Sequence, residues 1–100
     1  MSEEFLSVAI WDPVPGMEAA SLTTIREISN IIARKNYGRD LLYRSGRSYV
    51  LLRYWSSEPA RAAAHEDPEM LRCWARLGNE IQIVKVFEKL EEVTAAKSAT

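Results

Sequence analysis

The sequence predicts an α+β domain of the ferredoxin-like type, in the order β-α-β-β-α-β, with a four-stranded antiparallel sheet. Three observations predict it: strand-like segments near both ends of the chain, a hairpin signal in the middle, and helical patterns in the two intervals. With 100 residues, 47% of them hydrophobic and 27% charged, the chain suits one globular domain. We expect that domain to span residues 1–93 and residues 94–100 to form a flexible tail.

The first strand is predicted at residues 5–11, where FLSVAIW alternates between two sets of side chains. One face carries Leu6, Val8 and Ile10, and the other carries Phe5, Ser7, Ala9 and Trp11. The segment DPVPG ends the strand, because prolines and glycine interrupt regular structure. A helix is predicted over residues 17–36, with one apolar stripe formed by Leu22, Ile25, Ile28 and Ile32.

The middle of the chain predicts a β-hairpin. Residues 41–44 and 48–55 read as strands, and Ser45-Gly46 stands where a tight turn is needed.

The second helical segment follows the hairpin and is predicted to be broken. Ser56 or Ser57 caps its start, Pro59 is tolerated in the first turn, and Asp67-Pro68 predicts a stop and a new cap. The continuation has an apolar stripe of Met70, Cys73, Trp74, Leu77 and Ile81, although Gly78-Asn79 can end the helix earlier. Residues 81–90 are predicted as the fourth strand.

The predicted strands are apolar on both faces. Helices can cover only one face, and the other face of an antiparallel sheet is normally polar in a monomer. Large uncovered apolar surfaces mark interaction sites. The sequence therefore predicts a homodimer in which the uncovered sheet faces of two subunits pack together with two-fold symmetry.

Composition argues against several classes of function. The net charge of -1 and the isoelectric point near 5.8 disfavour nucleic-acid binding, which needs clustered Lys and Arg. The segment RSYVLLRY resembles an RNA-recognition strand only faintly, because Leu51 and Ser7 stand where stacking aromatics are required. No apolar run approaches the roughly 18 residues of a membrane span. A single cysteine favours a reducing cytoplasm.

Metal and phosphate sites are also disfavoured by the sequence. One histidine, one cysteine and scattered carboxylates give no ligand spacing for a metal. The four glycines are isolated from one another, so they form no phosphate-binding loop. We expect no metal and no cofactor.

The chain resembles the antibiotic biosynthesis monooxygenase superfamily over residues 5–92. The matching pieces are Pro15-Gly16 before the first helix, the hairpin LLYRSGRSYVLLRYW, and YWSSE leading into an alanine-rich helix that contains a histidine. The resemblance implies a ferredoxin-like subunit that dimerises into an α/β barrel, with an active cleft between the sheet and the helices of each subunit. It also implies an oxidoreductase class that includes cofactor-independent oxygenases of aromatic polyketides and quinols.

Haem-degrading relatives in that superfamily are a poorer match. They use an asparagine on the first strand, and a Trp and a His on the second helix. This chain has no asparagine in residues 5–11, and Ala64 and Trp74 stand near the positions expected for that Trp and His.

His65 and Arg53 are the candidate catalytic residues. His65 is the chain's single histidine, the residue type that exchanges protons near neutral pH, so it can act as a base. Its alternative role is a surface or half-buried helix residue. Arg53 interrupts an apolar strand, where an unpaired charge is costly. Its partner could be Asp12, Glu88 or an anionic ligand, and a salt bridge across the dimer is the favoured structural explanation.

Trp11, Tyr54 and Trp55 are the candidate substrate-binding residues. Trp11 and Trp55 end adjacent strands, and strand alternation places them on the same face of the predicted sheet. They can therefore line an aromatic slot for a planar ligand. Packing in the core or in the dimer interface is the alternative. Trp74 and Cys73 fall on the helical stripe and are expected in the core.

We therefore expect a cofactor-independent monooxygenase of a small aromatic or quinol-like compound. In this scheme His65 accepts the substrate proton, Trp11, Tyr54 and Trp55 hold the ring, and Arg53 stabilises the developing oxyanion. The alternative is a dimeric barrel that binds a small ligand, or has a structural role, without catalysis.

Overall fold

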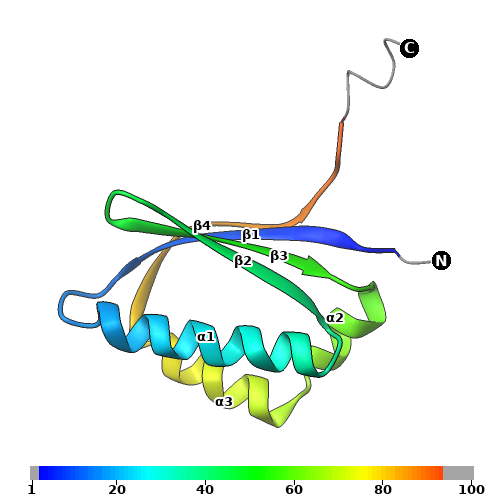
Figure 1. The fold of residues 1–100 in the computed structure, drawn as a ribbon, viewed down its shortest axis with the longest axis horizontal. Coiled ribbons are helices and arrows are strands. Elements are labelled where there is room, and N and C mark those ends of the chain that lie inside the picture. The colour runs from blue at the N-terminus through cyan, green and yellow to red at the C-terminus, as the bar shows by residue number, and fades with distance from the viewer. Residues whose placement is uncertain (1–2, 94–100) are drawn as a thin grey trace.

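The computed structural model describes residues 3–93, which form one sheet covered on one face by helices (Figure 1). The sheet has four antiparallel strands in the order β2-β3-β1-β4. The elements are β1 (Phe5–Pro13), α1 (Glu18–Arg34), β2 (Gly38–Ser45), β3 (Ser48–Trp55), α2 (Glu58–Ala64), α3 (Pro68–Leu77) and β4 (Ile81–Leu90). This is the predicted ferredoxin-like order, with the second helical segment in two pieces. The predicted tail, residues 94–100, lies outside the described residues.

The strands agree closely with the sequence-based bounds. β3 and β4 occupy the predicted residues, while β1 runs two residues further and β2 begins at Gly38 rather than at residue 41. Gly38 pairs with Trp55, and a Cβ atom at Gly38 would lie 2.1 Å from the carbonyl oxygen of Tyr54. Only glycine therefore allows the start of β2 to approach β3 this closely.

Helix α1 buries the predicted stripe against the sheet. Ile25, Ile28 and Ile32 are buried, and Leu22 is half-buried. The helix ends at Arg34, before the predicted end at residue 36, because Asn36 adopts a left-handed conformation with φ of 61°. Asparagine tolerates this conformation better than most residues, and it turns the chain toward β2.

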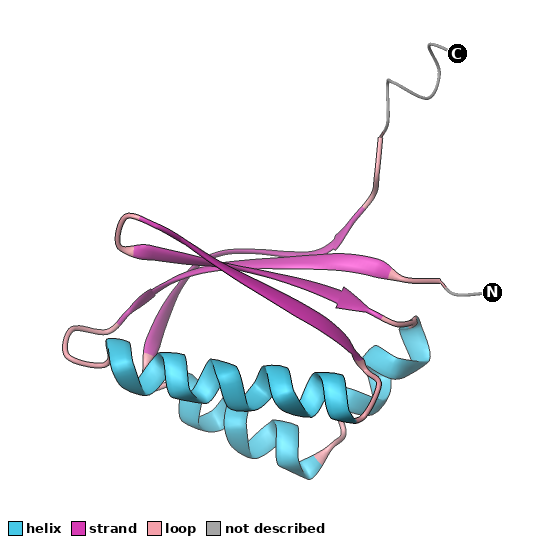
Figure 2. Cartoon of the chain, in the orientation of Figure 1, coloured by secondary structure: helices cyan, strands magenta, loops and turns pink. Residues whose placement is uncertain are grey.

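The break between α2 and α3 confirms the prediction from Asp67-Pro68. The Ser57 hydroxyl caps α2 by accepting a hydrogen bond from the Ala60 N–H at 3.1 Å. The Asp67 carboxylate caps α3 by accepting one from the Glu69 N–H at 2.8 Å. Because each short helix has its own cap, the chain can bend between them (Figure 2).

The core lies between the helices and the covered face of the sheet, in two clusters. The first cluster surrounds Trp55 and contains residues from β1, α1, α2 and α3, including Phe5, Ile28, Ile32, Ala64, Met70 and Cys73. The second surrounds Trp11 and contains Ile25, Tyr49, Leu51 and Ile81. The predicted core position of Cys73 is therefore confirmed.

The opposite face of the sheet, which we call the open face, is apolar and carries no helix (Figure 1). Pairing across the strands places three rows on it: Arg39, Tyr54, Leu6 and Leu90; Leu41, Leu52, Val8 and Phe87; Tyr43, Val50, Ile10 and Lys85. Arg39 and Lys85 are the two charged members of these rows, and each lies over an aromatic ring, that of Tyr54 and Phe87 respectively. Among residues 3–93, no helix is long and apolar enough to cross a membrane.

Candidate functional site

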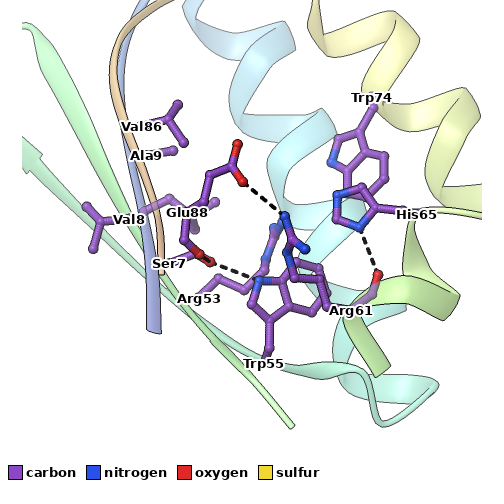
Figure 3. A pocket seen from close by; sticks show the side chains of 11 residues that line it. Ser7, Val8, Ala9, Arg53, Trp55, Arg61, His65, Trp74, Val86 and Glu88 are labelled. Carbon is purple, nitrogen blue, oxygen red and sulfur yellow. Dashed lines mark hydrogen bonds and ion pairs between the residues drawn. The ribbon is translucent and has the colours of Figure 1, made fainter. Parts of the chain in front are cut away.

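A pocket of about 240 Å³ lies on the covered face, between the sheet and the α2–α3 corner. We call it the outer pocket. The residues that line it come from β1, β3, α2, α3 and β4: Ser7, Val8, Ala9, Leu51, Arg53, Trp55, Arg61, His65, Trp74, Val86 and Glu88 (Figure 3). Six of these eleven residues are apolar and five are polar or charged, so the pocket combines an apolar wall with groups that can bind or orient a small molecule.

His65 follows the last residue of α2 and is held in a defined tautomer. Its Nδ1 atom lies 2.8 Å from the carbonyl oxygen of Arg61. A carbonyl oxygen can only accept a hydrogen bond, so Nδ1 carries the proton in the neutral ring. The Nε2 atom then keeps its lone pair and can accept a proton from another molecule.

Two tryptophans flank the imidazole ring. The centroid of His65 is 5.0 Å from that of Trp74 and 5.9 Å from that of Trp55. The Trp55 indole is fixed because its Nε1–H donates to the Ser7 hydroxyl at 3.0 Å. Figure 3 shows Trp74 and His65 side by side, with Trp55 below them. The corner therefore offers aromatic surfaces to a planar ligand.

Arg53 lines the outer pocket, but its partner is neither Asp12 nor Glu88. Its Nε and Nη2 atoms donate to the two carboxylate oxygens of Asp40, at 2.7 and 2.8 Å. Asp40 lies directly opposite on β2, so the salt bridge is within the subunit and does not cross a dimer, which corrects the sequence-based interpretation. The Arg53 Nη1 atom takes part in neither bond, and the guanidinium carbon lies 5.4 Å from the Trp55 ring centroid.

Trp11 and Tyr54 do not line the outer pocket. Trp11 is 1% exposed and stacks on Tyr49 in the second core cluster. Tyr54 points to the open face, where it lies against Arg39. The three predicted substrate-binding residues therefore do not share one slot, since strand alternation sends Tyr54 and Trp55 to opposite faces of the sheet. Trp55 is the one that meets His65.

An ion pair closes one side of the outer pocket. The Arg61 Nη2 atom lies 3.3 Å from a carboxylate oxygen of Glu88, which links α2 to β4. The backbone of Glu88 is held as well, because its carbonyl oxygen accepts a hydrogen bond from Ser7 Oγ at 2.5 Å. The Glu88 side chain is 77% exposed, so this link is a weak one that a ligand can displace.

A second pocket of about 180 Å³ lies deeper between the sheet and α3, and we call it the inner pocket. It shares Ala9, Leu51, Arg53 and Trp74 with the outer pocket, so the two are neighbours. The rest of its lining is apolar and consists of Trp11, Ile25, Ile28, Leu77, Ile81 and Ile83.

The strongest perturbation of a titratable group lies at the α2–α3 break. Hydrogen bonds from Lys35 and Tyr37 hold the pKa of the Asp67 carboxyl well below its usual range. Burial raises the pKa of the Cys73 thiol, which makes this cysteine a poor nucleophile. Among the described residues, no group of three or more His, Cys, Asp or Glu side chains is arranged to hold a metal.

Four residues of the site were not predicted from the sequence. Trp74 was assigned to the core, although it is half-buried and lines both pockets. Arg61 and Asp40 gave no signal of their own, and Glu88 was considered only as a partner for Arg53. The placement of Arg61 four residues before His65 on one helix was the usable hint, since such residues share a helical face.

Comparison with known proteins identifies the fold. No family model matches the chain, and no curated protein matches it. Solved structures do match over nearly the whole chain. SnoaB, a cofactor-independent oxygenase from Streptomyces nogalater, is 20% identical with a TM-score of 0.72, over 92% of this chain and 96% of that one.

Two further structures give the same result. Rv0793 from Mycobacterium tuberculosis is 19% identical with a TM-score of 0.72, over 92% of this chain and all of that one. A candidate antibiotic biosynthesis monooxygenase from Chloroflexus aurantiacus is 11% identical with a TM-score of 0.75, over 92% and 96% of the two chains. At these identities the likeness concerns the fold. It confirms that the chain has the fold of the antibiotic biosynthesis monooxygenase-like proteins.

Proposed function

We propose that the protein is a cofactor-independent monooxygenase that oxidises a small aromatic or quinol-like compound in the outer pocket. The observation that carries the proposal is the meeting of His65, Trp55, Trp74 and Arg53 around one pocket of about 240 Å³. A proton acceptor, aromatic surfaces and a hydrogen-bond donor are the groups that oxidation of a phenol-type ring requires. The fold shared with a cofactor-independent oxygenase supports this choice among the activities open to such a pocket.

His65 begins the reaction in this proposal. Its Nδ1–H is engaged with the Arg61 carbonyl, which leaves Nε2 to take the proton of a substrate hydroxyl or of an acidic ring carbon. The resulting imidazolium lies close to the Trp55 and Trp74 rings, whose faces favour a cation.

The oxidant is dioxygen, and the atoms balance without another reductant. The deprotonated ring donates electrons to dioxygen, and a C–O bond forms at a ring carbon that carries hydrogen. The hydroperoxide then loses water as its O–O bond and that C–H bond break, which leaves a carbonyl group. A phenol or anthrone and one O₂ thus give one quinone and one H₂O.

Arg53 contributes a hydrogen bond rather than a full charge. Asp40 offsets its positive charge, but Nη1 lies outside that salt bridge and can donate to an oxyanion at the pocket wall. Trp55 and Trp74 hold the ring. Tyr54 has no direct part in this scheme, because it lies on the open face.

We also propose that the protein is a homodimer through the open face. The three apolar rows cover all four strands, and several of their large side chains remain exposed, among them Leu41, Tyr43, Phe87 and Leu90. A second copy is the fitting occupant, because its face is equally apolar and a two-fold axis lets the same patch pack on itself. The outer and inner pockets lie on the covered face and stay accessible in such a dimer.

A binding protein without catalysis is the second candidate. The exposed Arg61–Glu88 ion pair at the pocket edge is consistent with it, because a ligand can displace the pair on entry whether or not a reaction follows. The two candidates differ in whether Nε2 of His65 is needed for turnover or only for binding.

The test compares wild type with His65→Asn and His65→Gln, using anthrone and 1-naphthol as substrates and quinone formation as the readout. Asparagine can keep the hydrogen bond that Nδ1 makes to the Arg61 carbonyl but offers no basic nitrogen in place of Nε2. We expect both variants to lose turnover by about a hundredfold or more, because a positioned base typically contributes that much. Substrate binding should change little.

Arg72→Gln, which alters an exposed residue of α3, is the matched control and should retain full turnover. Quinone formation by wild type above the protein-free rate supports the enzyme. Full turnover in His65→Asn would remove the base assignment, and saturable binding with no turnover in wild type would favour the carrier.

A further inference from the structure

Arg61 is a positively charged residue of the outer pocket that uses only part of its hydrogen-bonding capacity. Its Nη2 atom makes a single contact, 3.3 Å from a carboxylate oxygen of Glu88. Within residues 3–93, its Nε and Nη1 atoms make no hydrogen bond. A guanidinium binds a carboxylate best through two parallel N–H···O bonds, as Arg53 does with Asp40. The contact with Glu88 is therefore one that a better-placed carboxylate can replace.

The two partners of this ion pair differ in exposure. Both line the outer pocket, but the Arg61 side chain is 31% exposed and that of Glu88 is 77% exposed. Figure 3 shows Arg61 reaching from α2 toward Glu88, which belongs to the edge strand β4. Since an exposed ion pair contributes little free energy, the Glu88 carboxylate can turn into solvent at small cost. Arg61 then stays at the pocket with its charge unpaired, where it can bind an incoming anion.

Arg61 lies one helical turn before His65, the candidate base. The His65 N–H donates to the Arg61 carbonyl oxygen at 3.1 Å, and both side chains line the outer pocket. Residues four apart on a helix have Cβ atoms about 5–6 Å apart. A hydroxyl group at His65 Nε2 and a carboxylate at the Arg61 guanidinium can therefore belong to one aromatic ligand.

We propose that Arg61 selects substrates with a carboxylate on the aromatic ring, and that Glu88 occupies Arg61 while the pocket is empty. The inference rests on the proposed function and deepens it, because it assigns the substrate class as a hydroxyaromatic carboxylic acid. The hydroxyl lies at His65, and the carboxylate displaces Glu88 from Arg61. An ammonium substituent fits the same position poorly, because Arg61 and the imidazolium formed at His65 are both positive.

The experiment uses two probes of equal size that differ in charge. 4-Hydroxy-2-naphthoate is 1-naphthol with a carboxylate on the same ring, and 4-hydroxy-2-naphthamide carries a neutral carboxamide there. Arg61→Gln and Glu88→Gln remove opposite sides of one ion pair. Lys89→Gln is the matched control, because Lys89 pairs with Glu58 at 2.9 Å in a second exposed link between β4 and α2 but does not line the outer pocket. Calorimetry measures binding, and quinone formation measures turnover.

We expect the wild-type protein to bind the acid about tenfold more tightly than the amide, through a charge-assisted pair with Arg61. Arg61→Gln should abolish this preference and leave the affinity for the amide within about twofold. Glu88→Gln should raise the affinity for the acid about threefold, because it removes a weak competitor for Arg61. Lys89→Gln removes the same charge as Arg61→Gln and should keep the preference.

Three results would overturn the inference. Equal affinity of the wild-type protein for the two probes would remove selection by Arg61, and turnover of the amide in that case would leave the proposed function standing. A weaker affinity for the acid in Glu88→Gln would show that the ion pair supports the pocket rather than competing with the ligand. A loss of preference in Lys89→Gln as large as in Arg61→Gln would show a general effect of charge.

The opposite combination separates the two proposals as well. Preference for the acid that depends on Arg61, without turnover of either probe, would support the recognition site and overturn the monooxygenase. The wild-type and Glu88→Gln measurements keep the inference falsifiable if Arg61→Gln fails to fold.

Discussion

Arg53 and Asp40 show how a single residue pair sets the chemistry of the pocket wall. Their side chains are 10% and 3% exposed, and Ser29 also donates to Asp40 at 2.6 Å. A charge buried in this way is tolerated because the Asp40 carboxylate pairs with it through two hydrogen bonds. The pair therefore holds Arg53 beside Trp55 and limits its charge toward the pocket.

Removing one partner of the Arg53–Asp40 salt bridge should lower the stability of the folded protein. We expect Asp40→Ala to lower the free energy of unfolding by about 3 kcal/mol, because it leaves the Arg53 guanidinium buried and unpaired. Urea denaturation measures the change. The double variant Asp40→Leu with Arg53→Met should lose less than Asp40→Ala alone, and Glu58→Gln, which breaks an exposed pair with Lys89, should change little. A double variant less stable than Asp40→Ala would contradict this account.

Sequence reasoning found Arg53 but chose the wrong partner for it. A charge between Leu52 and Tyr54 had to be paired, and the pairing is confirmed. Asp40 was missed because the predicted second strand began at residue 41, one residue too late to place it opposite Arg53. Trp74 was missed as a pocket residue for another reason. Helical spacing shows that a residue faces inward, but not whether the interior there is filled or hollow.

The α2–α3 corner is the element that places His65, and Asp67 holds it together. Asp67 caps α3, and its carboxylate also accepts hydrogen bonds from Lys35 and Tyr37, both at 2.7 Å. Lys35 and Tyr37 follow α1, so Asp67 links the corner to the end of that helix. This part of the fold was well predicted, because Ser57 and Asp67-Pro68 are local signals that need no tertiary information.

The corner should make stability depend on pH in a defined direction. Because Lys35 and then Tyr37 lower the pKa of Asp67, its contribution is complete above its ordinary value of 3.8 and is lost as pH falls toward the folded-state value. We expect Asp67→Asn to lower the Tm by several degrees at pH 7, since it loses a charged cap and an ion pair. The difference from wild type should shrink as pH falls below 3.8.

Thermal unfolding followed by circular dichroism from pH 7 to pH 2 measures this trend. Glu66→Gln removes an exposed carboxylate next to Asp67 and serves as the control for a change in charge alone. A Tm difference between Asp67→Asn and wild type that stays constant across this range would contradict the role of the charged form.

At the scale of the whole molecule, the open face is an apolar surface that we propose is covered by a second copy of the chain. The sequence already predicted this, because β1 and β3 are apolar on both faces and alternation is visible without a structure. Strand order and register then place those residues in rows across all four strands. The family resemblance implied a cleft between the sheet and the helices, but the residues that line the pocket could not all be predicted, because they depend on how far the α2–α3 corner lies from the sheet.

Two measurements test the dimer: the mass of the wild-type protein in solution, and the mass of a variant with a charge placed in the open face. We expect light scattering to give about twice the subunit mass of 11.4 kDa at micromolar concentration. Leu52→Glu alters the middle row of the open face and should give a monomer. Leu71→Glu places the same charge at an exposed apolar residue of α3 and should leave the dimer intact. A wild-type monomer at that concentration would remove the dimer proposal.

If the outer pocket promotes the reaction of dioxygen with an aromatic ring, isotope labelling will detect the oxygen atom that is transferred. The wild-type protein is incubated with anthrone under ¹⁸O₂, and the product is analysed by mass spectrometry against a protein-free control. We expect anthraquinone with one ¹⁸O atom per molecule, formed faster than in the control and slowed to the control rate in His65→Asn. Product formed no faster than in the protein-free control, or a new oxygen that comes from water, would contradict it.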